Sequence, residues 1–238
     1  LASTNTRHKV VLSHSTPLYV GIYKIDGSPP VRAVLMTTKL LGLEFEGVEV
    51  NTLNLEQYKP EFVTKNPLHT VPLLEEDGFL LADSHAIITY LTSKYGADKR
   101  AVLYPVDLRT RATVDQRLYF DATIAFPKFI SIVKGIVRDK QAGPSPQQIS
   151  EVIEVYGFVE KYLERSPFLA GEHITLADIS VVSTVSTLDK LVPVEGKYER
   201  LNEWWSKLQE KDWYQAANVP GLEQFAGAMK MFIEKNST

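Results

Sequence analysis

The chain has 238 residues, of which 44% are hydrophobic and 23% charged, and it contains no cysteine. This is the composition of a globular protein, and the missing cysteines exclude disulfides, thiolate metal sites and a cysteine nucleophile. A net charge of −3 gives no basic footprint, and no apolar run approaches the roughly 18 residues that suggest a membrane span, so we expect neither nucleic acid nor membrane as a partner.

Residues 1–17 differ from the rest of the chain. Their one apolar run, Val10-Val11-Leu12, is shorter than the roughly 7–15 residues that a signal peptide needs in its core. We interpret the segment as a flexible N-terminal extension.

Residues 18–96 have the pattern of a small α/β domain. The apolar run at 18–23 predicts a buried strand, and Pro29, Pro30 and Gly42 delimit a helix, because proline is tolerated in a first turn and glycine ends a helix well. Further strands are expected at 44–50, 71–74 and 79–81, the last two as a hairpin, followed by a helix that Ser84 caps and that ends at Gly96.

The remainder reads as helical. Residues 97–107 are predicted to form a linker, and 108–238 an all-helical domain, because the apolar residues of 147–164, 201–208 and 222–233 recur at helical spacing. Thr175 and Asp178 have the spacing of a capping box at the start of a further helix.

Ser28 follows the first strand and precedes the first helix. Its hydroxyl would lie beside unpaired backbone N–H groups, a position that stabilises an anion, and it could donate a hydrogen bond to a bound thiolate. The alternative is that Ser28 only caps the helix.

Two further segments carry polar groups that a ligand could use. Pro72 lies inside a predicted strand, which favours a turn or a cis bond there. The N–H and C=O of Val71 would then be free for an extended ligand. The alternative is an ordinary edge strand that enters a turn. Asp83, Ser84 and His85 open a helix, so they combine N–H donors and a hydroxyl for a ligand carboxylate with a carboxylate for an amine; an ordinary cap is the alternative.

Asp121 stands among apolar and aromatic residues on a predicted helix. Burying a bare carboxylate is costly, so Asp121 either has a structural partner or serves a ligand.

Four segments stand in the order and spacing of one family: Ser28-Pro-Pro-Val-Arg32, Asn66-Pro-Leu-His-Thr-Val-Pro72, Asp83-Ser-His-Ala-Ile87 and Ile174-Thr-Leu-Ala-Asp178. From Leu18 to Glu234 the chain resembles glutathione S-transferases, and among them the insect delta/epsilon classes, epsilon above all. The resemblance implies a thioredoxin-like N-terminal domain followed by an all-helical domain, a cytoplasmic homodimer, glutathione as co-substrate, a hydrophobic second substrate and no metal.

The resemblance also implies the roles of individual residues. Ser28 would activate the glutathione thiol, and His69, Val71 and a cis-Pro72 would hold the peptide backbone. Asp83, Ser84 and His85 would bind the γ-glutamyl end. Gln57 stands where many epsilon members have a histidine, so it keeps a donor near the glycyl carboxylate but loses the positive charge.

A narrower likeness concerns the substrate. Several segments resemble the epsilon sublineage called Noppera-bo, which is associated with ecdysteroid biosynthesis: Leu35-Met36, Lys39-Leu40-Leu41, Gln57, Asp178 to Thr187, Tyr214 and Gly221-Leu-Glu223. In that group an acidic residue faces a sterol hydroxyl, and Asp121 falls at the matching place. We expect a substrate pocket formed by Arg117, Phe120, Asp121 and Ile124, together with Tyr119 and Phe126.

Two other functions fit the same scaffold. One is general detoxification of electrophilic xenobiotics. The other is non-catalytic carriage of hydrophobic ligands, which the presence of Ser28 disfavours, since a carrier needs no thiol activator.

Overall fold

The computed structural model describes residues 19–237. The predicted extension at 1–17 therefore lies outside the described residues, as does Leu18, the expected start of the first strand. No helix within residues 19–237 is long and apolar enough to cross a membrane.

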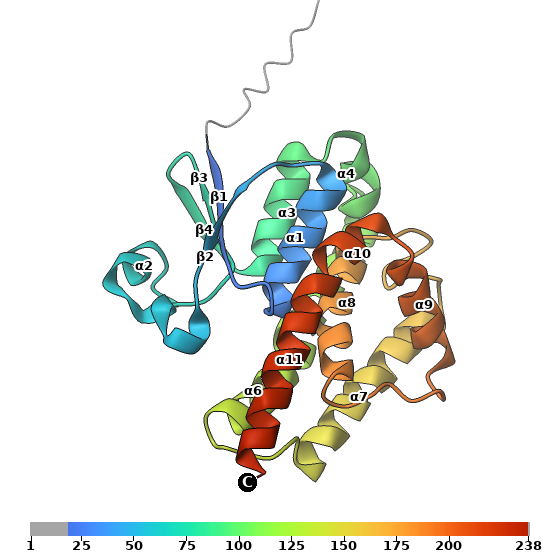
Figure 1. Cartoon of the computed structure of the whole chain (residues 1–238). Helices are drawn as coiled ribbons and strands as arrows, with labels where there is room; N and C mark the ends of the chain where they lie inside the picture. Colours follow the sequence, from blue (N-terminus) through green and yellow to red (C-terminus); the bar gives the residue numbers. More distant parts are fainter. Residues whose placement is uncertain (1–18, 238) are drawn as a thin grey trace, which may run out of the picture.

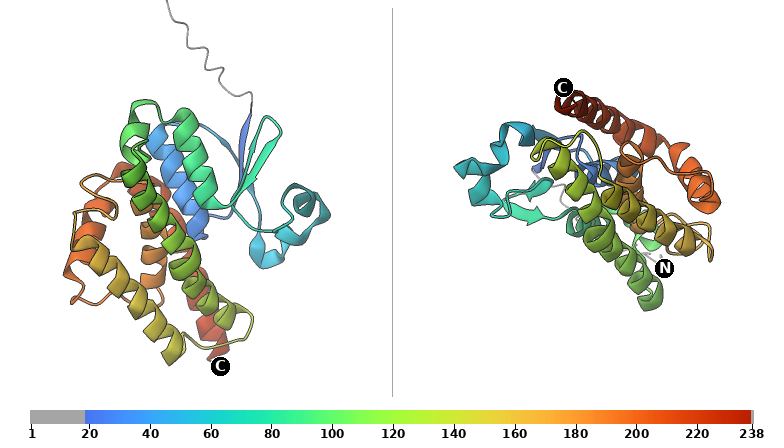
Figure 2. Two further views of the ribbon diagram at one scale, coloured as in Figure 1. Left: turned by 180° about the vertical axis from the view of Figure 1, so that it is seen from behind. Right: turned by 90° about the horizontal axis from the view of Figure 1, so that it is seen from below.

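The N-terminal part is a four-stranded sheet with helices on both faces (Figures 1 and 2). The strand order is β2-β1-β3-β4; β1 and β2 are parallel, and the other neighbours are antiparallel. Helices α1 and α3 cover one face, and α2 lies beyond the other. In chain order the elements are β1 (Val20–Lys24), α1 (Pro29–Leu41), β2 (Glu46–Glu49), the 3-10 turns η1 (Thr52–Asn54) and η2 (Glu56–Tyr58), α2 (Pro60–Lys65), β3 (Leu73–Glu76), β4 (Phe79–Ala82) and α3 (Ser84–Tyr95).

Local sequence explains the limits of α1. Pro29 and Pro30 occupy its first turn, and Gly42 ends it in the left-handed conformation at φ 70°, which favours glycine. The helix packs on β1, whose Ile22 is fully buried at the centre of the sheet. The predicted order of strands and helices is confirmed, with ends displaced by one or two residues.

The rest of the described chain forms a helical bundle with no named strand between residues 97 and 237. It comprises α4 (Ala97–Leu103), α5 (Leu108–Phe120), the π-helical turn η3 (Asp121–Ala125), α6 (Phe126–Val137), α7 (Pro146–Leu163), α8 (Leu176–Asp189), α9 (Glu199–Gln209), α10 (Asp212–Ala217) and α11 (Val219–Asn236). Helix α4 occupies much of the range predicted as a linker. The exact domain limits remain a prediction.

Helix α8 is the centre of the bundle. Every residue from Leu176 to Leu188 is buried, so the helix has no polar face and its serines and threonines turn inward to neighbours. Its start is the predicted capping box, in which the amide and the hydroxyl of Thr175 both donate to Asp178 Oδ2. Because α1 contacts α8 and α10, the helical bundle lies directly beneath the first helix of the sheet domain.

Candidate functional site

Ser28 is the residue that precedes α1, and its hydroxyl is free. The residue has the extended conformation of an N-cap, but its side chain accepts no capping hydrogen bond. Its backbone is fixed on both sides: the Ser28 amide donates to the carbonyl of Ile25, and the Arg32 amide donates to the carbonyl of Ser28, both at 3.0 Å. Because the half-buried hydroxyl accepts no cap bond within residues 19–237, it is available to a ligand, to which it can donate.

One part of the expectation for Ser28 is wrong. Unpaired N–H groups were expected beside the hydroxyl, but the first two residues of α1 are Pro29 and Pro30, which carry no N–H. The helix end thus presents fewer donors to an anion than an ordinary N-terminus does.

The segment before β3 exposes main-chain groups. The Val71–Pro72 peptide bond is cis, and neither the N–H nor the C=O of Val71 makes a hydrogen bond within residues 19–237. Asn66 holds the preceding loop by donating to the Thr70 carbonyl at 2.9 Å. Val71 can therefore pair with an extended peptide in the manner of an added strand.

Gln57 and His69 lie in adjacent segments. The exposed His69 ring lies against the ring of Tyr58, with centroids 4.6 Å apart, and this contact joins η2 to the loop before β3. Gln57 is the neighbour of Tyr58, and its Oε1 is buried without a hydrogen-bond partner. The unpaired Oε1 is an acceptor and suits a ligand N–H, whereas a ligand carboxylate would need a donor, such as the Gln57 Nε2 or the His69 ring.

The start of α3 differs from the prediction in one respect: Asp83, not Ser84, is the N-cap. The Asp83 carboxylate accepts from the amides of His85 at 2.9 Å and Ala86 at 3.1 Å. Both Asp83 and Ser84 are good capping residues. The backbone selects Asp83, because its φ of 76° is not helical, whereas Ser84 is already the first residue of the helix and is buried. The Asp83 side chain remains 57% exposed.

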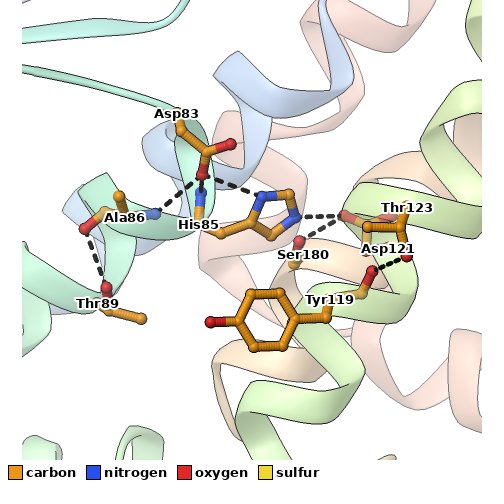
Figure 3. A network of polar contacts seen from close by, with 8 residues as sticks. All are labelled: Asp83, His85, Ala86, Thr89, Tyr119, Asp121, Thr123 and Ser180. Carbon is orange, nitrogen blue, oxygen red and sulfur yellow. Dashed lines mark hydrogen bonds and ion pairs between the residues drawn. The ribbon is translucent and has the colours of Figure 1, made fainter.

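His85 connects the sheet domain to the helical domain (Figure 3). Its Nδ1 lies 3.2 Å from Asp83 Oδ1 and its Nε2 lies 3.1 Å from Asp121 Oδ2, so both ring nitrogens face carboxylates. Burial lowers the pKa of His85, but the hydrogen bonds to Asp121 and Asp83 outweigh it and raise the pKa to about 9. His85 is therefore an imidazolium at neutral pH.

Asp121 begins the π-helical turn between α5 and α6 and is almost fully buried. Its Oδ2 accepts a hydrogen bond of 2.5 Å from Ser180 on α8 and faces His85, whereas its Oδ1 is buried with no partner. The carboxylate thus has the structural partners that sequence reasoning allowed, and a second oxygen that is still free. Ser180 was not predicted, because nothing in its local sequence indicates a contact with a residue 59 positions away.

The predicted pocket residues around Asp121 make several contacts of their own. Phe120 is buried against the rings of Phe158 and Tyr162 on α7, and Arg117 lies 3.5 Å over the Tyr162 ring and donates to the Leu169 carbonyl. Both side chains therefore contact α7, and their place in a substrate pocket stays a prediction. Arg117 lines a separate cleft of about 570 Å³.

The remaining predicted pocket residues divide between surface and core. Tyr119 and Ile124 are exposed, and Phe126 is partly buried against the core. Within residues 19–237 no group of three histidine or acidic residues could hold a metal ion.

Comparison with known proteins agrees with this geometry. Residues 22–99 match the family model of the glutathione S-transferase N-terminal domain, and residues 121–212 that of the C-terminal domain. Glutathione S-transferase 1 of Manduca sexta is 43% identical over 203 residues, which are 84% of this chain and 92% of the relative. The chain belongs to the glutathione S-transferase family.

Solved structures of glutathione transferases extend the match to the whole fold. An epsilon-class glutathione S-transferase of the housefly, Musca domestica, is 42% identical with a TM-score of 0.86, covering 90% of this chain and 98% of its own. A glutathione transferase homologue of Drosophila mojavensis with bound glutathione is 41% identical with a TM-score of 0.85, covering 90% and 97%. The predicted fold class and the enzyme class, glutathione transferase of the insect delta/epsilon type, are confirmed.

Proposed function

We propose that this glutathione transferase binds glutathione along the open edge formed by Val71 and the start of α3, with the sulfur at Ser28. The support is that the main-chain groups of Val71 and the Ser28 hydroxyl are free, and that the Asp83 carboxylate is exposed. In this proposal Asp83 and Ser84 bind the γ-glutamyl end, with His85 beside them. His69, Val71 and Pro72 hold the peptide, and Gln57 lies near the glycyl carboxylate.

The reaction follows from the free hydroxyl at Ser28. A donor to sulfur favours the thiolate over the thiol, and the thiolate is the nucleophile. The sulfur lone pair forms a carbon–sulfur bond with a hydrophobic electrophile. In a substitution the leaving group departs with the bonding electrons and takes a proton from solvent; in an addition the displaced electron pair takes that proton. The first turn of α1 contributes little to this stabilisation, because its two prolines carry no N–H.

Replacing Ser28 by alanine tests this activation. Because a free thiol titrates near 8.5, and each unit of depression corresponds to about 1.4 kcal/mol, we expect Ser28→Ala to lower turnover at neutral pH and to displace the pH–rate profile towards higher pH. Glutathione affinity should stay within several-fold, since the peptide contacts are untouched. A variant profile that overlays the parent profile would contradict the role of Ser28.

We further propose that the second substrate is a hydroxylated steroid, with a role in ecdysteroid biosynthesis as in the Noppera-bo sublineage. The single observation that carries this is the buried Asp121 Oδ1, which lacks a partner while Oδ2 has two. A ligand hydroxyl that donates to such an oxygen gains a charge-assisted hydrogen bond of roughly 1.5–3 kcal/mol. The exposed Tyr119 and Ile124 supply apolar surface close by in the chain.

The test compares two ligands on two proteins. Asp121→Ala should weaken binding of a hydroxylated steroid about tenfold or more, and should barely change turnover of a small aromatic electrophile. Equal losses for both ligands would mean that Asp121 only holds the helices together. No loss for either would leave general detoxification as the better function.

Assembly and location complete the proposal. A homodimer is supported by Phe79 and Leu80, two exposed apolar side chains on the edge strand β4. Exposure of such side chains to water is unfavourable, and a partner subunit would cover them. Light scattering of the full chain tests it. The cytoplasmic location implied by the family resemblance stays a prediction, which subcellular fractionation tests.

A further inference from the structure

Arg32 is a fully buried charge that pairs with no carboxylate. Its Nη1 donates to Asn218 Oδ1 at 2.6 Å and its Nη2 donates to Thr187 Oγ1, both neutral acceptors. Its Nε is buried without a partner, and no salt bridge of Arg32 exists within residues 19–237. A guanidinium in this state is costly, since a buried ion is normally compensated by an opposite charge.

The groups around Arg32 leave its charge uncancelled. Burial lowers the pKa of Arg32 to about 10, and the nearby Tyr214 and Asp26 oppose this only in part, so the side chain is still protonated at neutral pH. The Asp26 carboxylate is already paired with Lys24 at 2.8 Å. The Tyr214 hydroxyl accepts a hydrogen bond from Trp205 Nε1 and none from Arg32 within residues 19–237.

Arg32 lies one helical turn from Ser28. Its amide donates to the Ser28 carbonyl, and because helical side chains lean towards the N-terminus of their helix, we expect its side chain to extend towards the Ser28 end of α1. Gly221 on α11 closes this region: a Cβ there would collide with the Asp26 carbonyl and would lie 2.8 Å from Arg32 Cδ. The close approach of α11 excludes water, so the charge is weakly screened.

The two prolines at the start of α1 reduce the number of N–H groups that the helix can offer an anion. An ordinary helix offers an anion several free N–H groups at its N-terminus, but Pro29 and Pro30 remove the first two. We propose that the unpaired positive charge of Arg32 stabilises the glutathione thiolate held at Ser28, replacing the missing N–H groups. Arg32 acts through space, without touching the sulfur, and the inference rests on the proposed function of Ser28. By Coulomb's law at an effective dielectric constant near 20, any unit positive charge on the order of 10 Å from a thiol lowers the thiol pKa by about one unit.

The sharpest test adds a counter-charge and keeps the contact with Arg32. Asn218→Asp places a carboxylate of the same shape on the Arg32 guanidinium. Ser186, which now accepts from Asn218 and donates to the Ser183 carbonyl, can redirect its hydroxyl to the new carboxylate. In this variant we expect the pKa of the thiol of bound glutathione to rise by about one unit. The pKa is measured by titrating the ultraviolet absorbance of the thiolate. Thermal stability should hold or increase, because the buried charge is now paired.

Three further variants separate charge from contact. Asn218→Ala loses the hydrogen bond but adds no charge, and Arg32→Lys keeps the charge, so both should leave the thiol pKa within a few tenths of a unit of the parent value. Arg32→Gln removes the charge and should raise the thiol pKa as Asn218→Asp does. If Arg32→Gln does not fold, the Asn218 pair and Arg32→Lys still decide the outcome.

Two failures can be told apart. If Ser28→Ala raises the pKa of the bound thiol and Asn218→Asp leaves it unchanged, the role of Arg32 alone is overturned. A parent in which bound glutathione titrates like free glutathione overturns the proposed function of Ser28 together with this inference.

Discussion

Within residues 19–237 two carboxylates are buried in the helical domain, Asp178 in α8 and Asp121 against it, and they differ in how completely they are hydrogen-bonded. Asp178 Oδ1 accepts from the Leu169 amide and from Trp204 Nε1, both at 2.9 Å, and Oδ2 accepts from the amide and hydroxyl of Thr175. Asp121 uses one oxygen for Ser180 and His85 and leaves the other without a donor. A saturated carboxylate has no capacity left for a ligand, whereas a half-saturated one has. The first carboxylate therefore serves stability, whereas the second keeps one oxygen for the steroid hydroxyl that we propose as its ligand.

The largest expected effect is the loss of Asp178. Asp178→Ala strands three buried donors, the Leu169 and Thr175 amides and the Trp204 indole, and each unsatisfied buried group costs about 1–3 kcal/mol. We expect the free energy of unfolding to fall by roughly 3 kcal/mol or more, measured by urea denaturation. Asp121→Ala should cost less, because it strands one hydroxyl and one ring nitrogen. If Asp121→Ala were the more damaging variant, the contrast between the two regions would be refuted.

The next effect is a dependence of stability on pH that belongs to His85. The pKa of His85 is raised from 6.5 to about 9 in the folded chain, so its stabilisation is complete below pH 6.5 and is lost as pH rises through 9. Raising the pH from about 6 to about 10 should cost the parent about 2–3 kcal/mol more than it costs His85→Gln. The exposed His173 offers a matched control, because it forms no ion pair within residues 19–237 and His173→Gln therefore removes an imidazole without breaking a contact with a carboxylate. A parent and His85→Gln with parallel pH curves would show that His85 does not bridge the carboxylates in solution.

Local signals account for what the sequence predicted well. The prolines and Gly42 delimited α1, the spacing of Thr175 and Asp178 indicated the capping box, and Pro72 within a strand signal suggested the cis bond that is observed. Each of these depends on residues within a few positions of one another.

Features that depend on distant residues could not be predicted in this way. The contacts of Asp121 with His85 and Ser180 join three elements, and the π-helical turn that starts at Asp121 has no sequence signal. The burial of Arg32 runs against its residue type, since charged residues are rarely buried without a partner. The contacts of Arg117 and Phe120 with Tyr162 on α7 are likewise set by packing between helices distant in the chain.

A smaller effect tests the bonded oxygen of Asp121 by itself. Ser180→Ala removes the hydrogen bond to Asp121 Oδ2, and such a bond to a charged group contributes about 1.5–3 kcal/mol. We expect unfolding free energy to fall by about 1.5 kcal/mol, while discrimination in favour of a hydroxylated steroid persists, because Oδ1 is untouched. Ser183→Ala is the matched control, since that hydroxyl donates to the neutral Ser180 carbonyl. Loss of the steroid discrimination in Ser180→Ala would mean that the two oxygens of Asp121 are not functionally distinct.

The smallest effect concerns the partner of the saturated carboxylate. Thr175→Ala removes one of the four donors to Asp178 and weakens the cap of α8, which costs about 1 kcal/mol and, in a chain of this size, about 2–4 °C in melting temperature. Thr175→Ser keeps the hydroxyl and should recover most of this loss, which separates the hydrogen bond from the lost methyl group. Apparent glutathione affinity should stay unchanged in both variants, because the cap lies in the helical domain and Val71, Asp83 and Ser28 lie in the sheet domain. A folded Thr175→Ala enzyme that binds glutathione much more weakly would show that the capping turn of α8 also shapes the binding edge, and the division between a stability region and a binding region would fail.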